Sequence, residues 1–355
     1  MMSDKIDLRL FTAAQIRDWL YHGIRYAGLS EYLIDKQRAF AILANPYVED
    51  EMSLLSALYV NDRLGAYTYV FPDLMEKPCE RLIYWNTTLY VDPVYEGRGY
   101  AYIVIAQICE LYGADYFDLD AAKASVENLK YQGLNVEYLH NYLFTNKNIH
   151  LNSPKGVISY VSNAINRLRK SRKNRLLMDI SNSRYSLQYT SYVDDEMYEF
   201  IKTHSSKDVF LRKKETFNWI LQYPFLLESP LRGRCREDCK FSSNIKEFKL
   251  YGVVVREDDK MVGFVILRST PDEWAVKYLY YDSTDSKSVF LAIAEHLINY
   301  PKRRFFTTDE DLHDFVVGYN LYDHDSLYER SFAFPVSFDY DKGLNIQAGD
   351  GDNIT

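Results

Sequence analysis

The sequence predicts an α/β fold with mixed β-sheets, organised as two similar units. The first observation is the order of elements in residues 5–150, where strand-like runs alternate with runs of helical apolar spacing. The second is the return of this order after residue 184, with one hairpin expected at 54–71 and another at 249–268. The third is the length of 355 residues, which favours two domains over one.

These observations also suggest the domain boundaries. We expect a first unit over residues 1–150, a helical linker over 151–183, a second unit over 184–340 and a flexible tail over 341–355. Each unit is predicted to be a twisted mixed β-sheet flanked by helices. The linker carries six basic residues between Arg167 and Arg175. This run is either a solvated helix face or a docking patch for a phosphate-rich ligand.

In the first unit, Thr12 is a suitable N-cap for a helix and Gly133 a suitable stop for one. Pro93 ends a strand because proline cannot donate to a sheet ladder. The expected elements are a strand at 7–11, helices at 13–26 and 34–43, the hairpin at 54–71, a strand at 81–91, a helix through 103–111, a strand at 116–120, a helix at 125–131 and a strand at 136–144.

In the linker and the second unit, Asp194 is the expected N-cap of a helix that runs to residue 201. The other expected elements are a helix at 157–168, a strand at 186–190, a helix at 215–221, the hairpin at 249–268, a strand at 274–281, a helix at 288–299 and a strand at 304–307.

Composition and charge exclude several classes of protein. A net charge of −8 and a pI near 5.5 argue against a general nucleic-acid binder. The four cysteines show no disulfide framework, and Cys235 and Cys239 lack the second pair that a metal site would need. We therefore expect no metal. No run reaches the roughly 18 apolar residues of a membrane span and no secretory leader is visible, so we expect a cytoplasmic protein. The sequence does not specify the oligomeric state.

The segment that carries chemistry lies between the strand at 81–91 and the helix that follows. Gly97 and Gly99 stand in this short turn, and neither has a Cβ atom to keep an anion away from the backbone. A strand, a glycine turn and a helix N-terminus together present unpaired N–H groups and the positive end of a helix dipole to a phosphate. The glycine pair alone is weak evidence, since many such turns bind nothing.

The run from Val91 to Ala101, Val-Asp-Pro-Val-Tyr-Glu-Gly-Arg-Gly-Tyr-Ala, resembles the acyl-CoA-binding motif of the GNAT acyltransferase superfamily. With the element order, the resemblance covers residues 5–150. It implies that acetyl-CoA or another acyl-CoA binds with its pantetheine beside the strand and its pyrophosphate in the turn, at Leu89, Tyr90, Val91, Gly97, Arg98, Gly99, Tyr100 and Ala101. Glu96 departs from the family, which usually has Arg or Gln there. In the second unit, the turn at 282–288 contains no glycine, so we expect that unit to be a degenerate GNAT-like one without a CoA site.

Acyl transfer needs a base for the incoming amine, donors for the oxyanion and an acid for the leaving thiolate. The glutamate and tyrosine that GNAT enzymes often use do not transfer, because the strand at 83–89 has no carboxylate and Leu129 stands where the tyrosine is expected. The candidates that remain are Asp118 and Asp120 as bases on one strand face, Tyr131 as a displaced tyrosine, and Asn86 as a residue that orients the acceptor. The aspartates also suit a structural role. By family analogy, the N–H group of Tyr90 or Val91 would serve the oxyanion.

Two classes of function follow. The favoured one is an acyltransferase that moves an acetyl or other acyl group from acyl-CoA to a small-molecule or peptide amine bound between the two units. A variant of it resembles the aminoacyl-tRNA-dependent peptidoglycan enzymes, which also pair two such units. The alternative class is a catalytically silent module that binds acyl-CoA or a protein partner.

Overall fold

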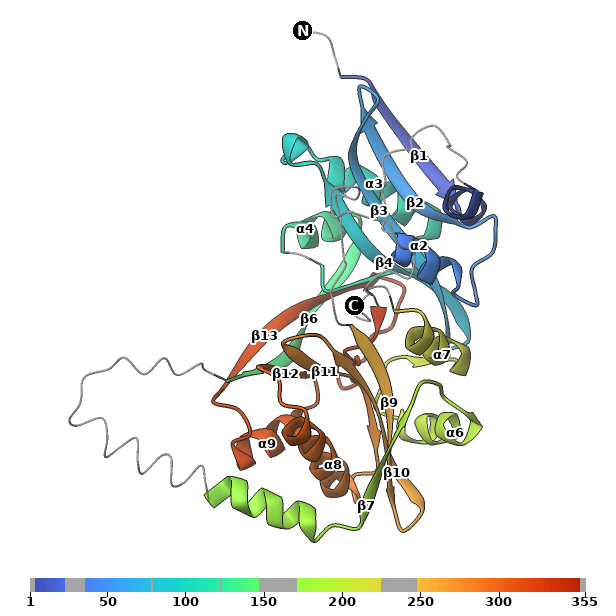
Figure 1. Ribbon diagram of the computed structural model, residues 1–355. Coiled ribbons are helices and arrows are strands. Elements are labelled where there is room, and N and C mark those ends of the chain that lie inside the picture. Colours follow the sequence, from blue (N-terminus) through green and yellow to red (C-terminus); the bar gives the residue numbers. More distant parts are fainter. Residues whose placement is uncertain are drawn as a thin grey trace, which may run out of the picture. The chain divides into compact units, whose positions relative to one another are not determined.

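A computed structural model describes residues 4–22, 36–77, 79–121, 123–146, 171–224 and 248–351 (Figure 1). The chain forms two compact units, and each is assembled from separate stretches of sequence. Unit 1 comprises Met1–Leu139, Lys207–Lys249 and Arg330–Thr355, and unit 2 comprises His140–Ser206 and Leu250–Glu329. The predicted α/β class is confirmed.

The sheet of unit 1 has the strand order β1-β2-β3-β4-β5-β13. Neighbouring strands are antiparallel except β4 and β5, which run parallel. The strands are β1 (Ile6–Thr12), β2 (Ser53–Val60), β3 (Arg63–Lys77), β4 (Arg81–Val91), β5 (Tyr116–Leu119) and the part of β13 (His324–Pro335) from Arg330 onward, and a short strand, β8 (Leu211–Arg212), pairs with β3.

One face of this sheet is covered by α3 (Tyr100–Tyr112) (Figure 1). The buried α3 residues Val104, Ile105 and Ile108 are spaced for one helix face and pack on strand residues such as Leu58 and Val70. α4 (Lys123–Tyr131) packs beside α3 and is followed by a turn at Gly133, whose φ of 81° suits the predicted helix stop.

Two further helices of unit 1, α2 (Lys36–Leu43) and α7 (Lys214–Gln222), are held together by Trp219. Its indole Nε1 donates to the carbonyl of Ala41 at 2.7 Å, and its ring centroid lies 5.5 Å from that of Phe71 in β3. The first helix, α1 (Ala13–Arg17), has the predicted Thr12 cap as part of a capping box and continues into a π-helical turn, η1 (Asp18–His22).

Unit 2 has the strand order β6-β12-β11-β10-β9-β7. Its core lies between this sheet and α8 (Ser286–Asn299), which comes so close to β10 that a Cβ on Gly263 would lie 2.5 Å from Cγ2 of Val289. Its elements are the part of β6 (Leu134–Thr145) from His140 onward, helical residues 171–181, β7 (Tyr185–Thr190), α6 (Asp195–His204), β9 (Lys249–Glu257), β10 (Lys260–Ser269), β11 (Glu273–Tyr281), α8, β12 (Arg304–Thr307) and α9 (Glu310–Tyr319).

The boundaries of the two units differ from the predicted ones because two strands each pair with the sheet of the other unit from the one expected. β6 follows α4 in sequence, yet residues 142–145 pair with β12 in the sheet of unit 2. The strand beside β5 in unit 1 is instead β13, where Phe332 and Ala333 face Leu119 and Asp118. Neither β13 nor α9 was predicted from the sequence, although Asp309 caps α9 and accepts from the N–H of Leu312.

The structure describes most of the predicted tail and only the last part of the predicted linker. The expected helix at 157–168 lies outside the described residues, and residues 171–181 are helical. The expected flexible tail is largely packed into unit 1, since Ile346, Gln347, Ala348 and Asp350 are all buried. None of the helices among the described residues is long and apolar enough to cross a membrane.

Candidate functional site

The turn between β4 and α3 leaves its backbone open. It contains a short 3-10 helix, η2 (Pro93–Tyr95), and leads to the first residue of α3, Tyr100. Gly97 and Gly99 have φ angles of 77° and 78°, which side chains rarely adopt. A Cβ atom on either glycine would meet no other atom within 4 Å. The N–H groups in the first turn of α3 have no acceptor inside the helix, so the turn offers exposed donors at the positive end of the helix dipole.

Arg98 is the one cationic side chain of this turn, and it is already paired. The guanidinium of Arg98 pairs with Asp4, with Nη1 and Oδ2 3.2 Å apart, and lies 5.5 Å from the centre of the Tyr95 ring. Glu96 ends η2 and is exposed. Because Arg98 shares its charge with Asp4, any affinity of the turn for an anion rests chiefly on the backbone N–H groups.

The other expected cofactor residues lie along β4 and the start of α3. Leu89 and Val91 pack toward α3, and the Tyr90 ring stacks on that of Tyr67 with centroids 5.2 Å apart. Tyr100 is buried and Ala101 is half-buried in the first turn of the helix. The predicted residues therefore form one continuous stretch from the end of β4 to the N-terminus of α3.

β4 separates from β5 immediately before this stretch. The pairing of the two strands consists of Tyr84 with Tyr116 and Trp85 with Phe117. From Asn86 to Val91, β4 stays paired with β3 but is not paired with the described residues of β5. A parallel pair that opens in this way leaves a backbone edge at which an extended ligand can lie.

A buried polar chain lies at the point of separation. The hydroxyl of Thr68 donates to Oδ1 of Asn86 at 2.7 Å, and Nδ2 of Asn86 donates to Oδ2 of Asp118 at 2.7 Å. Burial, with the negative charge of Asp118 nearby, raises the pKa of the Cys109 thiol to about 12. The structure thus brings together two of the predicted catalytic residues, Asn86 and Asp118, and leaves Cys109 protonated.

The other two predicted catalytic residues, Asp120 and Tyr131, are exposed, unlike the buried pair. β5 ends at Leu119, and Asp120 follows with a φ of 67° and an exposed side chain, so the expected strand face shared with Asp118 is not formed. Tyr131 ends α4, is 79% exposed and packs edge-on against Tyr102 with centroids 5.2 Å apart.

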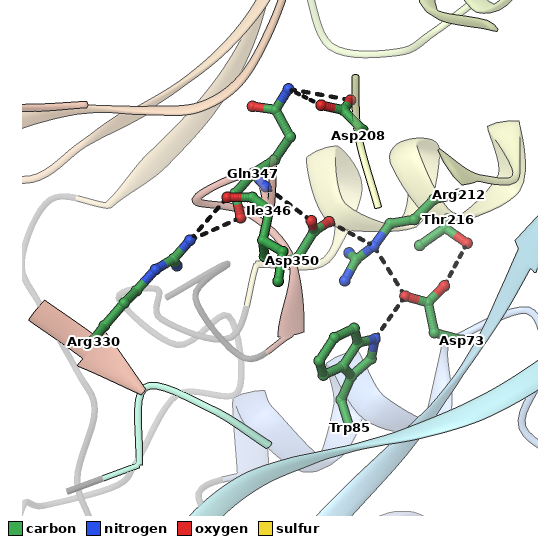
Figure 2. A network of polar contacts seen from close by, with 9 residues as sticks. All are labelled: Asp73, Trp85, Asp208, Arg212, Thr216, Arg330, Ile346, Gln347 and Asp350. Atoms are coloured by element: carbon green, nitrogen blue, oxygen red, sulfur yellow. Dashed lines mark hydrogen bonds and ion pairs between the residues drawn. The ribbon is translucent and has the colours of Figure 1, made fainter. Parts of the chain in front are cut away.

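The C-terminal residues form a buried polar cluster in unit 1 that was not predicted from the sequence (Figure 2). Arg212 lies between two carboxylates, with its Nε 3.0 Å from Asp73 and 3.6 Å from Asp350. Gln347 donates through Nε2 to Asp208 at 3.2 Å, and Arg330 donates to the carbonyl of Gln347 at 3.2 Å. These contacts hold the last described residues of the chain inside the unit.

This cluster places the C-terminal segment against the separating strands. A Cβ on Gly351 would lie 2.9 Å from Cβ of Leu119 and 3.2 Å from the ring of Trp85. The indole of Trp85 donates to Asp73 at 3.1 Å, so the same residue touches both the tail and the cluster. Leu119 and Trp85 adjoin Asp118 and Asn86 in sequence, and the tail therefore supports the strands that carry the polar pair.

The cluster predicts how stability depends on pH. Burial and the charge of Asp350 raise the pKa of Asp208 to about 8, far above the 3.8 of a free aspartate. Between about pH 4 and pH 8 the folded protein keeps a proton that the unfolded chain has lost, so the free energy of unfolding falls as pH rises through this range. We expect Asp208→Asn to reduce this slope by up to about 1.4 kcal/mol per pH unit.

Urea unfolding at a series of pH values measures this slope. Asp339→Asn, at an exposed position, is the matched control and should leave it unchanged. The same slope in Asp208→Asn as in the unaltered protein would show that Asp208 is ionised in the fold.

Comparison with known proteins identifies the fold. No protein-family model matches the sequence, and no curated protein sequence matches it either. Among solved structures, a GCN5-related N-acetyltransferase from Anabaena variabilis is 10% identical over 92% of this chain and 72% of that chain, with a TM-score of 0.50. Saccharomyces cerevisiae N-myristoyltransferase with bound myristoyl-CoA is 11% identical over 99% of this chain and 85% of that chain, also with a TM-score of 0.50. The chain has the GNAT fold.

The prediction of a GNAT-like fold is confirmed. That the second unit is a degenerate GNAT-like repeat without a CoA site stays a prediction. Its turn after β11 does carry Asp282 and Asp285 in place of glycines, and α8 begins at Ser286. Within the described ranges, no three His, Cys, Asp or Glu side chains gather as a metal site requires, and Cys235 and Cys239 lie outside those ranges.

Four residues of the buried polar cluster were not predicted from the sequence: Arg212, Asp208, Gln347 and Asp350. A polar, glycine-containing C-terminus looks like a mobile tail, because its hydrogen-bond partners are remote in sequence. One signal was present. Asp350 and Gly351 follow the apolar residues Ile346 and Ala348, whose burial shows that the segment is part of the core.

Proposed function

We propose that this protein is an acyl-CoA-dependent N-acyltransferase, which moves an acetyl or other acyl group to a small-molecule or peptide amine. The observation that carries the proposal is the glycine turn at the N-terminus of α3, continuous with the open edge of β4. The open space above Gly97 and Gly99 suits a diphosphate, and the β4 edge suits the amide-bearing pantetheine arm. The donor would bind through Leu89, Tyr90, Val91, Gly97, Arg98, Gly99, Tyr100 and Ala101.

The reaction forms a C–N bond and breaks the C–S bond of the thioester. The amine nitrogen attacks the carbonyl carbon and loses a proton to a base, and CoA leaves as a thiolate that a proton then neutralises. We propose Asp118 as the base, because it lies where β4 and β5 separate and is held by Asn86. Asp120 is the alternative base and Tyr131 the candidate acid. Backbone N–H groups of β4 would stabilise the oxyanion.

The second candidate is a GNAT-like module that binds acyl-CoA or a protein partner without catalysis. It is favoured by two observations: Asp118 is buried and already accepts a hydrogen bond from Asn86, and Tyr131 is exposed. A silent module that binds acyl-CoA would share the donor site with the enzyme and differ only in the chemistry.

Release of CoA thiol separates the two candidates. The purified protein is incubated with acetyl-CoA or myristoyl-CoA and a panel of amines and amino-terminal peptides, and calorimetry measures the affinity for each CoA compound. We expect binding in the micromolar range and thiol release that at least one amine accelerates. Binding without acceleration by any amine would favour the silent module. No binding of CoA or either acyl-CoA would overturn the enzyme and the acyl-CoA-binding module, and would favour the module that binds a protein partner.

A further inference from the structure

A β-bulge interrupts β4 just beyond its separation from β5. In the register with β3, Val70 faces Asn86 and Thr68 faces Leu89. Tyr69 therefore stands opposite both Thr87 and Thr88, and one residue of β4 is extra. Bulges of this kind re-aim the backbone and side chains of the strand that carries them.

The bulge contains an unfavourable backbone conformation. Thr88 has a φ of 59°, in the left-handed region. A β-branched residue is rarely found there, because its Cβ substituents crowd the backbone. Such a conformation persists only where surrounding contacts enforce it, and it is often found at functional sites.

The enforcing contact comes from Arg38 in α2. Its Nη1 donates to the hydroxyl of Thr87 at 3.2 Å and to the hydroxyl of Thr88 as well. Consecutive side chains of a regular strand point to opposite faces, so one guanidinium nitrogen can reach both hydroxyls only because of the bulge. Arg38 is 6% exposed, which fixes the guanidinium in place.

The bulge lies next to the residues assigned to the base and to the donor. It lies between Asn86, which holds Asp118, and Leu89, which begins the stretch assigned to the donor. The last pair of β4 with β5 is Trp85 with Phe117, so the backbone of the bulge belongs to the open edge. The direction of its N–H groups sets where a thioester carbonyl can accept a hydrogen bond at this edge.

We propose that Arg38 is a positioning residue for acyl transfer: it clamps Thr87 and Thr88 and so fixes the bulge whose backbone receives the thioester carbonyl. The inference rests on the proposed function, because it assigns the bulge to the acyl group. Arg38 acts through the backbone of β4 and not by contact with the donor. Its loss should therefore affect the reaction of the acyl group and not the affinity for CoA itself.

A double-mutant cycle tests the clamp. Arg38→Met is combined with Thr88→Gly, since glycine adopts a positive φ without enforcement. With acetyl-CoA as the probe, thiol release to water or to an active amine is measured, together with the affinity for CoA that carries no acyl group. We expect Arg38→Met to lower the rate constant by about 10- to 100-fold, with the affinity for CoA unchanged.

The remaining variants define the mechanism. Arg38→Lys should keep an intermediate rate, because an ammonium replaces the charge but is a less well-oriented donor for two hydroxyls. In the Thr88→Gly background, Arg38→Met should cost less than about threefold. An equal loss in both backgrounds would overturn the clamp and show direct contact with the substrate. Arg17→Met, which removes a partly exposed ion pair with Asp50, is the matched control.

A crystal structure of Arg38→Met separates this inference from the proposed function. If the unaltered protein binds no CoA compound, the proposed function fails, but the clamp is still tested by the φ of Thr88. We expect Thr88 to leave the left-handed region in Arg38→Met. A bulge that keeps its conformation without Arg38 would overturn the inference.

Discussion

Replacing Gly99 with glutamate is expected to weaken CoA binding by at least about 100-fold, beyond what calorimetry detects for a micromolar ligand. Gly99 has a φ of 78° and is the N-cap of α3. A glutamate there must adopt a left-handed conformation, at a cost of roughly 1–2 kcal/mol, and it places a carboxylate where the diphosphate is expected to lie. The N–H donors at the start of α3 would then face a resident anion.

Two smaller substitutions separate charge from shape. Gly99→Asn and Gly99→Asp have the same size, and both residues tolerate the left-handed conformation better than other side chains. We expect Gly99→Asn to keep CoA affinity within about tenfold, while Gly99→Asp loses more at low salt than at high salt. Equal affinities for the two variants would mean that no anion of the ligand lies near this turn.

Replacing Asp118 with asparagine is expected to lower the rate of amine acylation by about 10²- to 10⁴-fold, the usual contribution of a general base. The side chain keeps its shape, and its amide oxygen can still accept from Nδ2 of Asn86, which donates to Asp118 at 2.7 Å. The affinity for acetyl-CoA should stay the same, because this residue lies apart from the turn that binds the diphosphate. Steady-state rates at saturating acetyl-CoA measure the effect.

Asp120→Asn is the control for this experiment. Asp120 is exposed and follows the end of β5, so we expect its variant to react at a nearly normal rate. Thermal unfolding of both variants shows whether either change acts through stability. A normal rate in Asp118→Asn with a lost rate in Asp120→Asn would transfer the role of base to Asp120.

The sequence predicted the local elements well, because their signals are short in range. The glycine turn adopts the left-handed angles that Gly97 and Gly99 permit, and Asp194 caps α6 through its bond from the N–H of Met197. The hairpin of β2 and β3 turns at Asn61 and Asp62, both with positive φ. Each of these outcomes depends on residues within one or two turns of chain.

The features that the sequence did not predict depend on partners far along the chain. β6 follows α4 directly, and nothing in its residues indicates that it pairs with β12 while β13 takes the place beside β5. Likewise, Gln347 is separated by 139 residues from its acceptor Asp208. In the candidate site, the glycine turn was predictable because its signal is local. The contact of Asn86 with Asp118 was not, because it requires the parallel register of β4 and β5.

The central claim is that the turn before α3 and the open edge of β4 bind an acyl-CoA. A crystal structure of the protein with CoA tests it most directly. We expect the diphosphate within hydrogen-bonding distance of the N–H groups between Gly97 and Tyr102, and the pantetheine arm along Leu89 to Val91. CoA bound at the turn of residues 282–288, or a turn before α3 left empty at saturating CoA, would contradict the account.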